Sequence, residues 1–208
     1  MRELIVSELL TLDGVMEAPG GEPGHPHSGW AFDYMGEDVI ATKLDEVLEA
    51  GSLLLGRVTY ESFASAWPDR GGDHPVVEDV LAGVSATVAA LANRLNAMPK
   101  HVASTTLRDP AWHNTTAIDG DVPAAVARLK AQDGGPIVVN GSRTLVQALI
   151  AHDLVDVYRL TVMPVAVGSG DRLFPETQRK TSLDLVDVRS FASGAVTQTY
   201  RTSPKRAG

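Results

Sequence analysis

The stretch that decides the fold is IVVNGSRTLVQALI, residues 137–150. Its first three residues are β-branched and apolar, as in a strand buried on both faces of a sheet. Its last part, from Leu145 to Leu149, places apolar residues at helical spacing. Gly141 and Ser142 therefore stand where a strand ends and a helix begins. A glycine there lets another group approach the backbone closely, and the first amides of the helix point outward unpaired.

A second junction of the same kind lies in SLLLGRVTYESF, residues 52–63. Residues 52–55 form a short apolar run typical of a buried strand, Gly56 interrupts it, and residues 58–63 begin a helix. One glycine at such a corner is explained by packing. Two junctions with the same pattern favour a shared role in binding.

Both junctions carry a cation and hydroxyl groups within a few residues of the glycine: Arg57, Thr59, Ser142, Arg143 and Thr144. Backbone amides, a helix dipole, a guanidinium fork and hydroxyl donors are the groups that a pyrophosphate requires. The pattern therefore predicts a phosphate-bearing ligand at Gly56 and Gly141. The alternative is ordinary turn chemistry.

Hydroxyl groups also follow a third predicted strand, residues 101–103, where Ser104, Thr105 and Thr106 precede Arg108. Ligands collect at the carboxyl ends of strands in α/β sheets, although a hydroxyl cluster more commonly satisfies the backbone of a turn. The sequence has neither a GxGxxG motif followed by an acidic residue nor a GxxxxGK[ST] loop. The common NAD fingerprint and the P-loop are thus both excluded.

The remaining pattern predicts an α/β fold in one domain, residues 1–202, with a flexible tail at 203–208. Further strands are expected at residues 4–10 and 155–163, helices at 38–50, 76–96 and 122–132, and an antiparallel hairpin at 183–191 and 195–201. Gly83 is a candidate break in the second of these helices. Residues 18–29, APGGEPGHPHSG, are too rich in Gly and Pro for regular structure and are interpreted as a surface loop or as a lid over a site.

Composition excludes several classes of function. The net charge of −8 argues against binding nucleic acid or an anionic membrane, and the absence of cysteine excludes disulfides and thiolate chemistry. No apolar run approaches the roughly 20 residues that span a bilayer, and no signal pattern opens the chain, so we expect a soluble cytoplasmic protein. His25 and His27 lack an obvious third ligand, so no metal site is expected.

Taken in order, the motifs resemble the dihydrofolate reductase superfamily, specifically small proteins similar to the reductase domain of the riboflavin-biosynthesis deaminase-reductases. The landmarks are TLDG at residues 11–14, LGRVTYESF at 55–63, PKHVASTTL at 99–107, VVNGSRTLVQALI at 138–150 and LVDVYRLTVMPVAVGSGDRLFP at 154–175. The resemblance implies a central mixed, mostly parallel sheet flanked by helices, an NADPH cofactor, a small-molecule substrate and a homodimer.

The resemblance also implies roles for particular residues. Cofactor contacts fall at three strand ends: Gly56, Arg57 and Thr59 in a Gly-Arg-x-Thr phosphate contact, Ser104, Thr105 and Thr106 at the adenosine 2′-phosphate, and Gly141, Ser142, Arg143 and Thr144 under the pyrophosphate and nicotinamide half. Asp13 lies in a Thr-Leu-Asp-Gly motif whose aspartate is a suspected catalytic group in the riboflavin reductases. The alternative for Asp13 is an Asx-turn residue beside Gly14.

Two departures from the family bear on the substrate. Riboflavin reductases commonly have Leu-Val-Asp-Glu where this chain has Val157 in place of the last acid, and the pterin-binding carboxylate of dihydrofolate reductases falls near Ile40, with Asp38 the closest acid. We therefore expect an NADPH-dependent reductase of a small heterocyclic, carbonyl or imine compound, with a 5-amino-6-(5-phosphoribosylamino)uracil-like molecule as one candidate. A nucleotide-binding protein without turnover is the alternative.

Overall fold

The computed structural model describes residues 1–68, 85–174, 176 and 180–203, and within them eight strands form one sheet in the order β4-β3-β2-β5-β1-β6-β8-β7. The strands are β1 (Leu4–Thr11), β2 (Ser52–Gly56), β3 (Lys100–Ala103), β4 (Thr115–Ile118), β5 (Ile137–Val139), β6 (Val157–Met163), β7 (Leu183–Ser190) and β8 (Val196–Thr202). The first six strands in this order, β4-β3-β2-β5-β1-β6, are parallel to one another. Strands β8 and β7 complete the sheet as an antiparallel hairpin.

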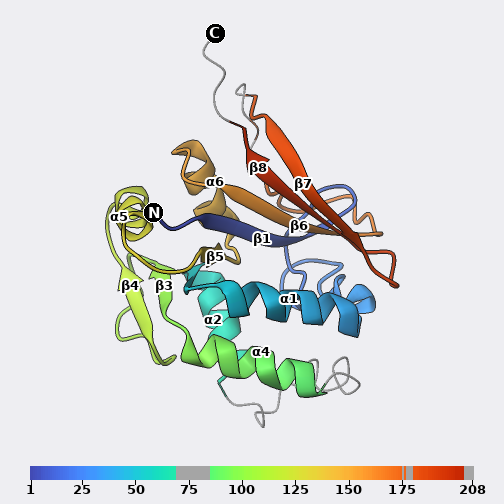
Figure 1. Ribbon diagram of the computed structural model, residues 1–208. Coiled ribbons are helices and arrows are strands. Elements are labelled where there is room, and N and C mark those ends of the chain that lie inside the picture. The colour runs from blue at the N-terminus through green and yellow to red at the C-terminus, as the bar shows by residue number, and fades with distance from the viewer. Residues whose placement is uncertain (69–84, 175, 177–179, 204–208) are drawn as a thin grey trace.

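Helices cover both faces of this sheet (Figure 1). They are α1 (Glu37–Glu49), α2 (Arg57–Ala66), α4 (Ser85–Ala97), α5 (Val122–Ala131) and α6 (Arg143–Ala151), with a short 3₁₀ turn η1 (Phe32–Tyr34) before α1. Side chains of α1, α2 and α4 pack together in one core cluster, and those of α5 and α6 pack in another. The expected α/β fold with a mixed, mostly parallel sheet and a terminal hairpin is therefore confirmed.

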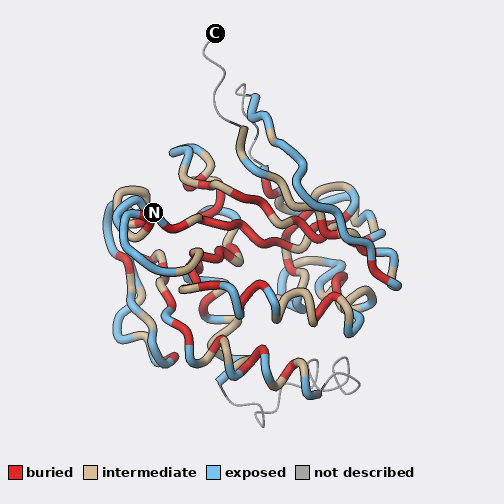
Figure 2. Tube along the Cα trace, viewed as in Figure 1, coloured by how far each residue is buried: buried red, intermediate tan, exposed pale blue. Residues whose placement is uncertain are grey.

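The central strands are buried on both faces because their sequences are continuously apolar. In β2, Leu54 joins the cluster under α6, while Leu53 and Leu55 point to the α1 side, as the twofold alternation of a strand requires. Figure 2 shows the central strands as buried and β7 as largely exposed. Each fully buried Leu or Ile stabilises the fold by about 1.5–3 kcal/mol relative to an exposed one.

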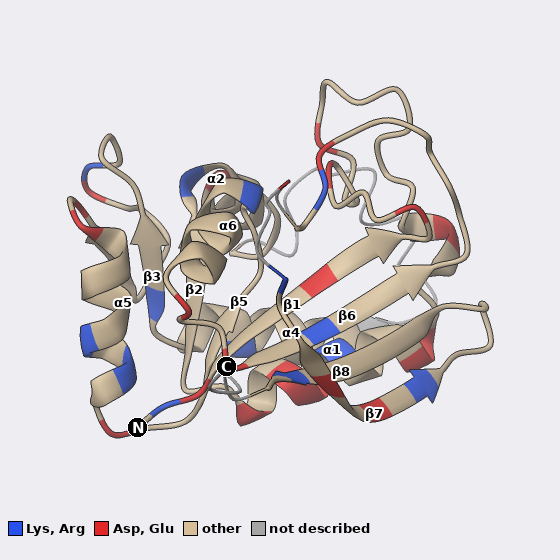
Figure 3. Cartoon of the chain, turned by 90° about the horizontal axis from the view of Figure 1, so that it is seen from above, with Lys and Arg blue, Asp and Glu red and all other residues tan. Residues whose placement is uncertain are grey.

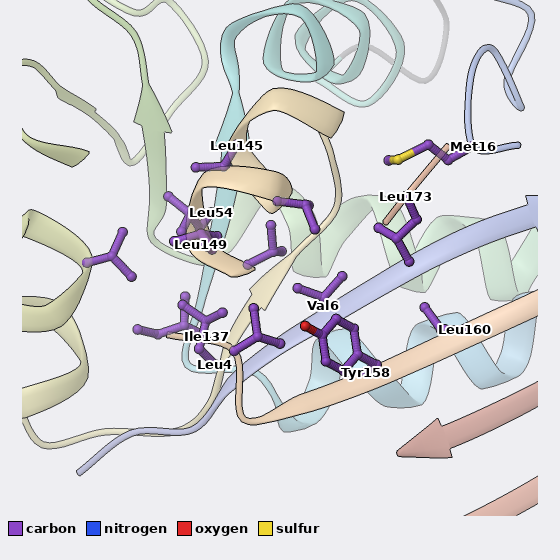
Figure 4. Close-up of a cluster of buried hydrophobic side chains, with 14 of the residues drawn as sticks. Leu4, Val6, Met16, Leu54, Ile137, Leu145, Leu149, Tyr158, Leu160 and Leu173 are labelled. Carbon is purple, nitrogen blue, oxygen red and sulfur yellow. The ribbon is translucent and has the colours of Figure 1, made fainter. Parts of the chain in front are cut away.

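The core under α6 explains the pattern of residues 137–150, which was quoted at the start of the sequence analysis. Figure 4 shows Leu145 and Leu149 of α6 meeting Val6 and Ile137 from the strands below, with Tyr158 beside them. The 3-4 spacing of the helix thus places its apolar face on the same strands that precede it in sequence. Strand β5, α6 and β1 form one packed unit.

Element boundaries differ from the sequence expectation in a few places. Strand β4 was not predicted, because its sequence TTAI has one buried residue and no strong alternation. The strand expected from residue 155 begins at Val157, because Asp156 instead accepts a hydrogen bond from the Leu4 amide at 2.8 Å and pairs with Lys130 at 2.6 Å. Residues 76–84 of one expected helix, including Gly83, and residues 204–208 of the expected tail lie outside the described residues.

Residues 18–29 contain turns and no regular element, as expected. Polar contacts nevertheless hold the segment in place. The Gly29 amide donates to Ala18 O at 2.9 Å, and Nε2 of His25 lies 3.0 Å from Ser169 O. Trp30, which follows, is buried and donates its indole N–H to Glu17 O at 2.8 Å. In the part of the chain that the structure describes, no helix is long and apolar enough to cross a membrane.

Candidate active site

The two glycine junctions touch each other. The Gly56 amide donates to Gly141 O at 3.1 Å, and a Cβ added to Gly56 would lie 2.9 Å from Cβ of Ser142. A Cβ added to Gly141, which has a φ of +61°, would lie 2.7 Å from Oγ1 of Thr59. Each glycine is therefore required by the packing of one junction against the other, whatever else approaches it. Four of the predicted site residues meet at this point.

The starts of α2 and α6 are consequently neighbours, and Figure 3 shows the two helices side by side with a basic segment on each. Neither N-cap residue, Gly56 or Ser142, makes a side-chain capping hydrogen bond. In contrast, α5 is capped by Asp121, whose carboxylate accepts from the Ala124 amide at 3.0 Å. The first amides of α2 and α6 thus remain available to an anion, which the helix dipoles also favour.

Arg57 and Arg143 stand at the first positions of these helices, and both are exposed. Arg57 pairs with Glu61 at 2.8 Å, and Arg143 pairs with Asp171 at 2.9 Å. Exposed ion pairs of this kind contribute only about 0–1 kcal/mol. A phosphate could therefore displace either carboxylate at small cost.

The hydroxyl cluster after β3 lies beside Arg57, because Gly56 and Ala103 are paired across β2 and β3. Ser104 is buried, and its hydroxyl accepts from the Thr106 amide at 3.2 Å and from the Leu107 amide at 2.9 Å. This is the backbone-satisfying use of a hydroxyl considered above. Thr105 and Thr106 are exposed and turn toward solvent at the same edge.

Asp13 is held in a turn. Its carboxylate accepts hydrogen bonds from the Thr11 hydroxyl at 2.6 Å, the Val167 amide at 3.2 Å and the Gly168 amide at 2.9 Å. The Thr11 hydroxyl first, and then the Gly168 amide, lower the pKa of Asp13 to about 2. The geometry fits the turn alternative, with Asp13 joining the end of β1 to the loop after β6, and a catalytic role for it stays a prediction.

Strands β1 and β5 diverge at the carboxyl edge of the sheet. Strand β5 pairs with β1 only as far as Val6, whereas β1 continues to Thr11 beside β6. From this point β1 leads toward α1 on one face of the sheet, and β5 leads into α6 on the other. Ligands of α/β sheets bind outside the carboxyl ends of strands at such a switch point. The interlocked glycines lie on the β2 side of this switch point.

Glu8 lies beside this switch point and was missed in the sequence. The Gly141 amide donates to its Oε1 at 2.5 Å, so the carboxyl joins β1 to the turn between β5 and α6. The side chain is 9% exposed, and this burial raises its pKa to about 8, against the opposing effects of the Gly141 amide and the charge of Lys43. The signal was available, because Leu4, Val6 and Leu10 share its side of the strand and an acid in that apolar row needs a reason.

A polar network on the opposite side of β1 was also missed. The Ser7 hydroxyl donates to Glu46 at 2.5 Å, and Nζ of Lys43 donates to Ser7 at 3.0 Å and to Glu46 at 3.1 Å. Asn140 adds a hydrogen bond from its amide to Ser7 O at 2.7 Å. This network stands between β1 and α1, where the acid of dihydrofolate reductases was sought at Asp38 and Ile40.

Neither of those two residues supplies an acid to the switch point between β1 and β5. Ile40 is buried in the core under α1. Asp38 serves the start of α1, where it accepts from the Val39 amide at 2.9 Å, and it also accepts from the Ala192 amide at 3.1 Å. Lys43 and Glu46 are therefore the charged side chains that α1 directs toward β1.

With this geometry in view, residues 2–197 match the family described as the RibD C-terminal domain. The chain belongs to the RibD C-terminal domain family. The uncharacterized protein YyaP of Bacillus subtilis (strain 168) is 27% identical over 199 residues, covering 96% of this chain and 94% of YyaP. The uncharacterized protein YwjB of the same organism is 36% identical over 78 residues, which are 38% of this chain and 45% of YwjB.

Solved structures show the same fold across this family and its neighbours. A putative riboflavin biosynthesis protein from Shewanella sp. PV-4 superposes with a TM-score of 0.70 at 19% identity, covering 97% of this chain and 99% of its own. A pyrimidine reductase-like protein from Corynebacterium diphtheriae gives 0.58 at 12% identity, with 98% and 93% covered. Dihydrofolate reductase from Enterococcus faecalis, complexed with NADP(H), gives 0.54 at 17% identity, with 97% of each chain covered. The chain has a reductase fold of the dihydrofolate reductase type.

Proposed function

We propose that this protein is an NADPH-dependent reductase that transfers hydride to a small heterocyclic, carbonyl or imine substrate. One observation carries the proposal: two strand–glycine–helix junctions interlock at the carboxyl edge of the sheet and leave two uncapped helix starts side by side. Family membership and the NADP(H) complex of the Enterococcus faecalis enzyme support the same reading.

The pyrophosphate of the cofactor would be held by the first amides of α2 and α6, with Thr59, Ser142, Arg143 and Thr144 as further donors. The 2′-phosphate would be held by Arg57, with the exposed hydroxyls of Thr105 and Thr106 beside it. Arg57 is suited to this because its present partner Glu61 is exposed and weakly held. The nicotinamide would then reach the switch point between β1 and β5, since this point adjoins the Gly141 turn.

The bound cofactor would supply the hydride. The protein would hold the substrate against it beside the buried strands β1 and β5, where the surrounding core would exclude water. A second copy of the chain is part of the proposal. β7 is the last strand of the sheet, and Leu185, Val186 and Val188 on it are each more than half exposed, a combination that another chain commonly covers.

Fluorescence titration of the purified protein with NADPH and with NADH tests the cofactor assignment. We expect NADPH to bind at least about tenfold more tightly, because one charge-assisted phosphate contact is worth roughly 1.4 kcal/mol or more. Equal affinities would remove the 2′-phosphate assignment. A screen of pterins, aminopyrimidines and dicarbonyls for NADPH oxidation then tests turnover, and binding without any oxidation would favour a nucleotide-binding protein.

A further inference from the structure

Glu8 is an acidic side chain on the side of β1 that packs into the hydrophobic core. It occupies the apolar side of β1 between Val6 and Leu10, yet it makes no ion pair at salt-bridge distance within the described residues. Its Oε1 accepts from the Gly141 amide, and within the described residues no hydrogen bond engages its Oε2, which is not among the fully buried side-chain atoms without a partner. Burying a carboxyl costs free energy unless its oxygens are hydrogen-bonded or its charge is paired, so an acid kept here with one oxygen unbonded is a candidate for a function.

The position of the carboxyl points to the reacting end of the site. It bridges β1 and the β5–α6 turn at the point where the two strands diverge. The Gly141 amide fixes one oxygen, which orients the carboxyl, and the second oxygen is left for a proton. No other acid lies in β1, so Glu8 is the acidic group that this strand contributes to the switch point between β1 and β5.

We propose that Glu8 is the general acid of the reduction, which donates the proton on Oε2 to the heteroatom of the bound substrate. This inference rests on the proposed function. The reduced nicotinamide, when bound, would supply a hydride, the hydrogen of its C4–H bond with the electron pair, and the carbon of the substrate C=O or C=N group would accept it in a new C–H bond. The π electrons of that group pass to its heteroatom, which takes the Glu8 proton. The substrate is reduced, the cofactor is oxidised, and the Glu8 carboxylate regains a proton from water.

The charges around the two acids at this edge agree with this assignment. Glu8 is kept neutral by burial, with its pKa raised to about 8, and faces the Gly141 amide from the turn and the charge of Lys43 from α1. Asp13 has a pKa lowered to about 2 and is ionised at neutral pH. An efficient general acid has a pKa near the working pH, and this condition is met by Glu8 and not by Asp13.

The test compares Glu8→Gln with Glu3→Gln. Glutamine at position 8 still accepts from the Gly141 amide but donates no acidic proton, and Glu3, in a surface ion pair with Arg201, controls for changing an acid to an amide next to the same strand. We expect Glu8→Gln to bind NADPH within about threefold of wild type and to lose about 10²–10⁴ in turnover of whichever probe the wild type reduces. Turnover within threefold of wild type would overturn the assignment.

A binding measurement keeps the inference testable without a substrate. The ring of NADP⁺ carries a positive charge that NADPH lacks, so NADP⁺ next to Glu8 should lower its pKa and release a proton. Calorimetry at pH 7.5 in two buffers of different ionisation enthalpy should show this release for the wild type and Glu3→Gln but not for Glu8→Gln. Equal release by all three would overturn the role of Glu8 while leaving cofactor binding intact. Failure of the wild type to bind either cofactor would overturn the proposed function, and the acid role with it.

Discussion

Gly141 and Thr59 come from separate strand–helix junctions, yet a Cβ on Gly141 would stand 2.7 Å from Oγ1 of Thr59. Gly141 also has a φ of +61°, which side chains other than glycine rarely adopt. This contact links the two junctions into one unit. The packing of the two junctions therefore requires glycine at position 141, whatever ligand also approaches it.

We therefore expect Gly141→Ala to destabilise the fold by about 1–3 kcal/mol, since it adds both backbone strain and a steric overlap. Chemical denaturation of wild type and variant measures this directly. In the double variant with Thr59→Ala, the overlap is relieved and the backbone strain remains, so part of the loss should return. A Gly141→Ala protein as stable as wild type would show that the junctions are less tightly packed than the geometry requires.

How much of this site can be predicted from sequence depends on which force places each residue. Gly56 and Gly141 were found because a buried strand followed by a helix leaves a local pattern of periodicity and turn residues. Their mutual contact was not found, because it depends on β5 being inserted between β2 and β1, a long-range pairing that no local pattern encodes. Ser104 was placed correctly at the edge, but its use in the turn depends on which amides it faces.

Glu8 was missed for a different reason. Glu8 shares its side of β1 with Leu4, Val6 and Leu10, but Ile5 and Leu9 on the other side are apolar as well, so the strand has no clear alternation that assigns Glu8 to a buried face. The buried network of Ser7, Lys43 and Glu46 likewise joins a strand to a helix more than 30 residues away. Buried polar groups are specified by their partners, and partners distant in sequence are the least predictable feature of a chain.

Removing Arg57 should affect the two reduced cofactors unequally. We expect Arg57→Ala to weaken NADPH about tenfold or more and NADH by less than about threefold, because only NADPH has the 2′-phosphate. Fluorescence titration of both cofactors gives the ratio, and Arg128→Ala, an exposed cation on α5, controls for the change in net charge. A uniform loss for both cofactors would assign Arg57 to the pyrophosphate instead.

Asp13→Asn separates the turn role of Asp13 from a catalytic one. The variant loses ionic acceptors for the Thr11 hydroxyl and the Gly168 amide, so we expect a lower thermal midpoint at neutral pH. The difference from wild type should shrink as the pH falls through about 2, because the wild-type carboxylate is then protonated as well. Thr11→Val removes one hydrogen bond from the same turn and keeps the Asp13 carboxylate itself. Turnover reduced to a similar degree in both variants indicates a turn role, whereas loss in Asp13→Asn alone indicates catalysis.

The burial of Glu8 makes stability itself depend on pH. Its pKa is raised from 4.5 to about 8 by folding, so the folded state binds a proton more tightly than the unfolded chain. The stabilisation from the neutral acid is complete below the unfolded pKa and is lost as the pH rises through about 8. Between these values the free energy of unfolding should fall by up to about 1.4 kcal/mol per pH unit relative to Glu8→Gln, in which this titration is absent. Urea denaturation at intervals from pH 5 to pH 9 measures both proteins, and Glu3→Gln should follow the wild type. Parallel curves for wild type and Glu8→Gln would mean that Glu8 is ionised in the folded protein, which would leave no proton on Oε2 to donate.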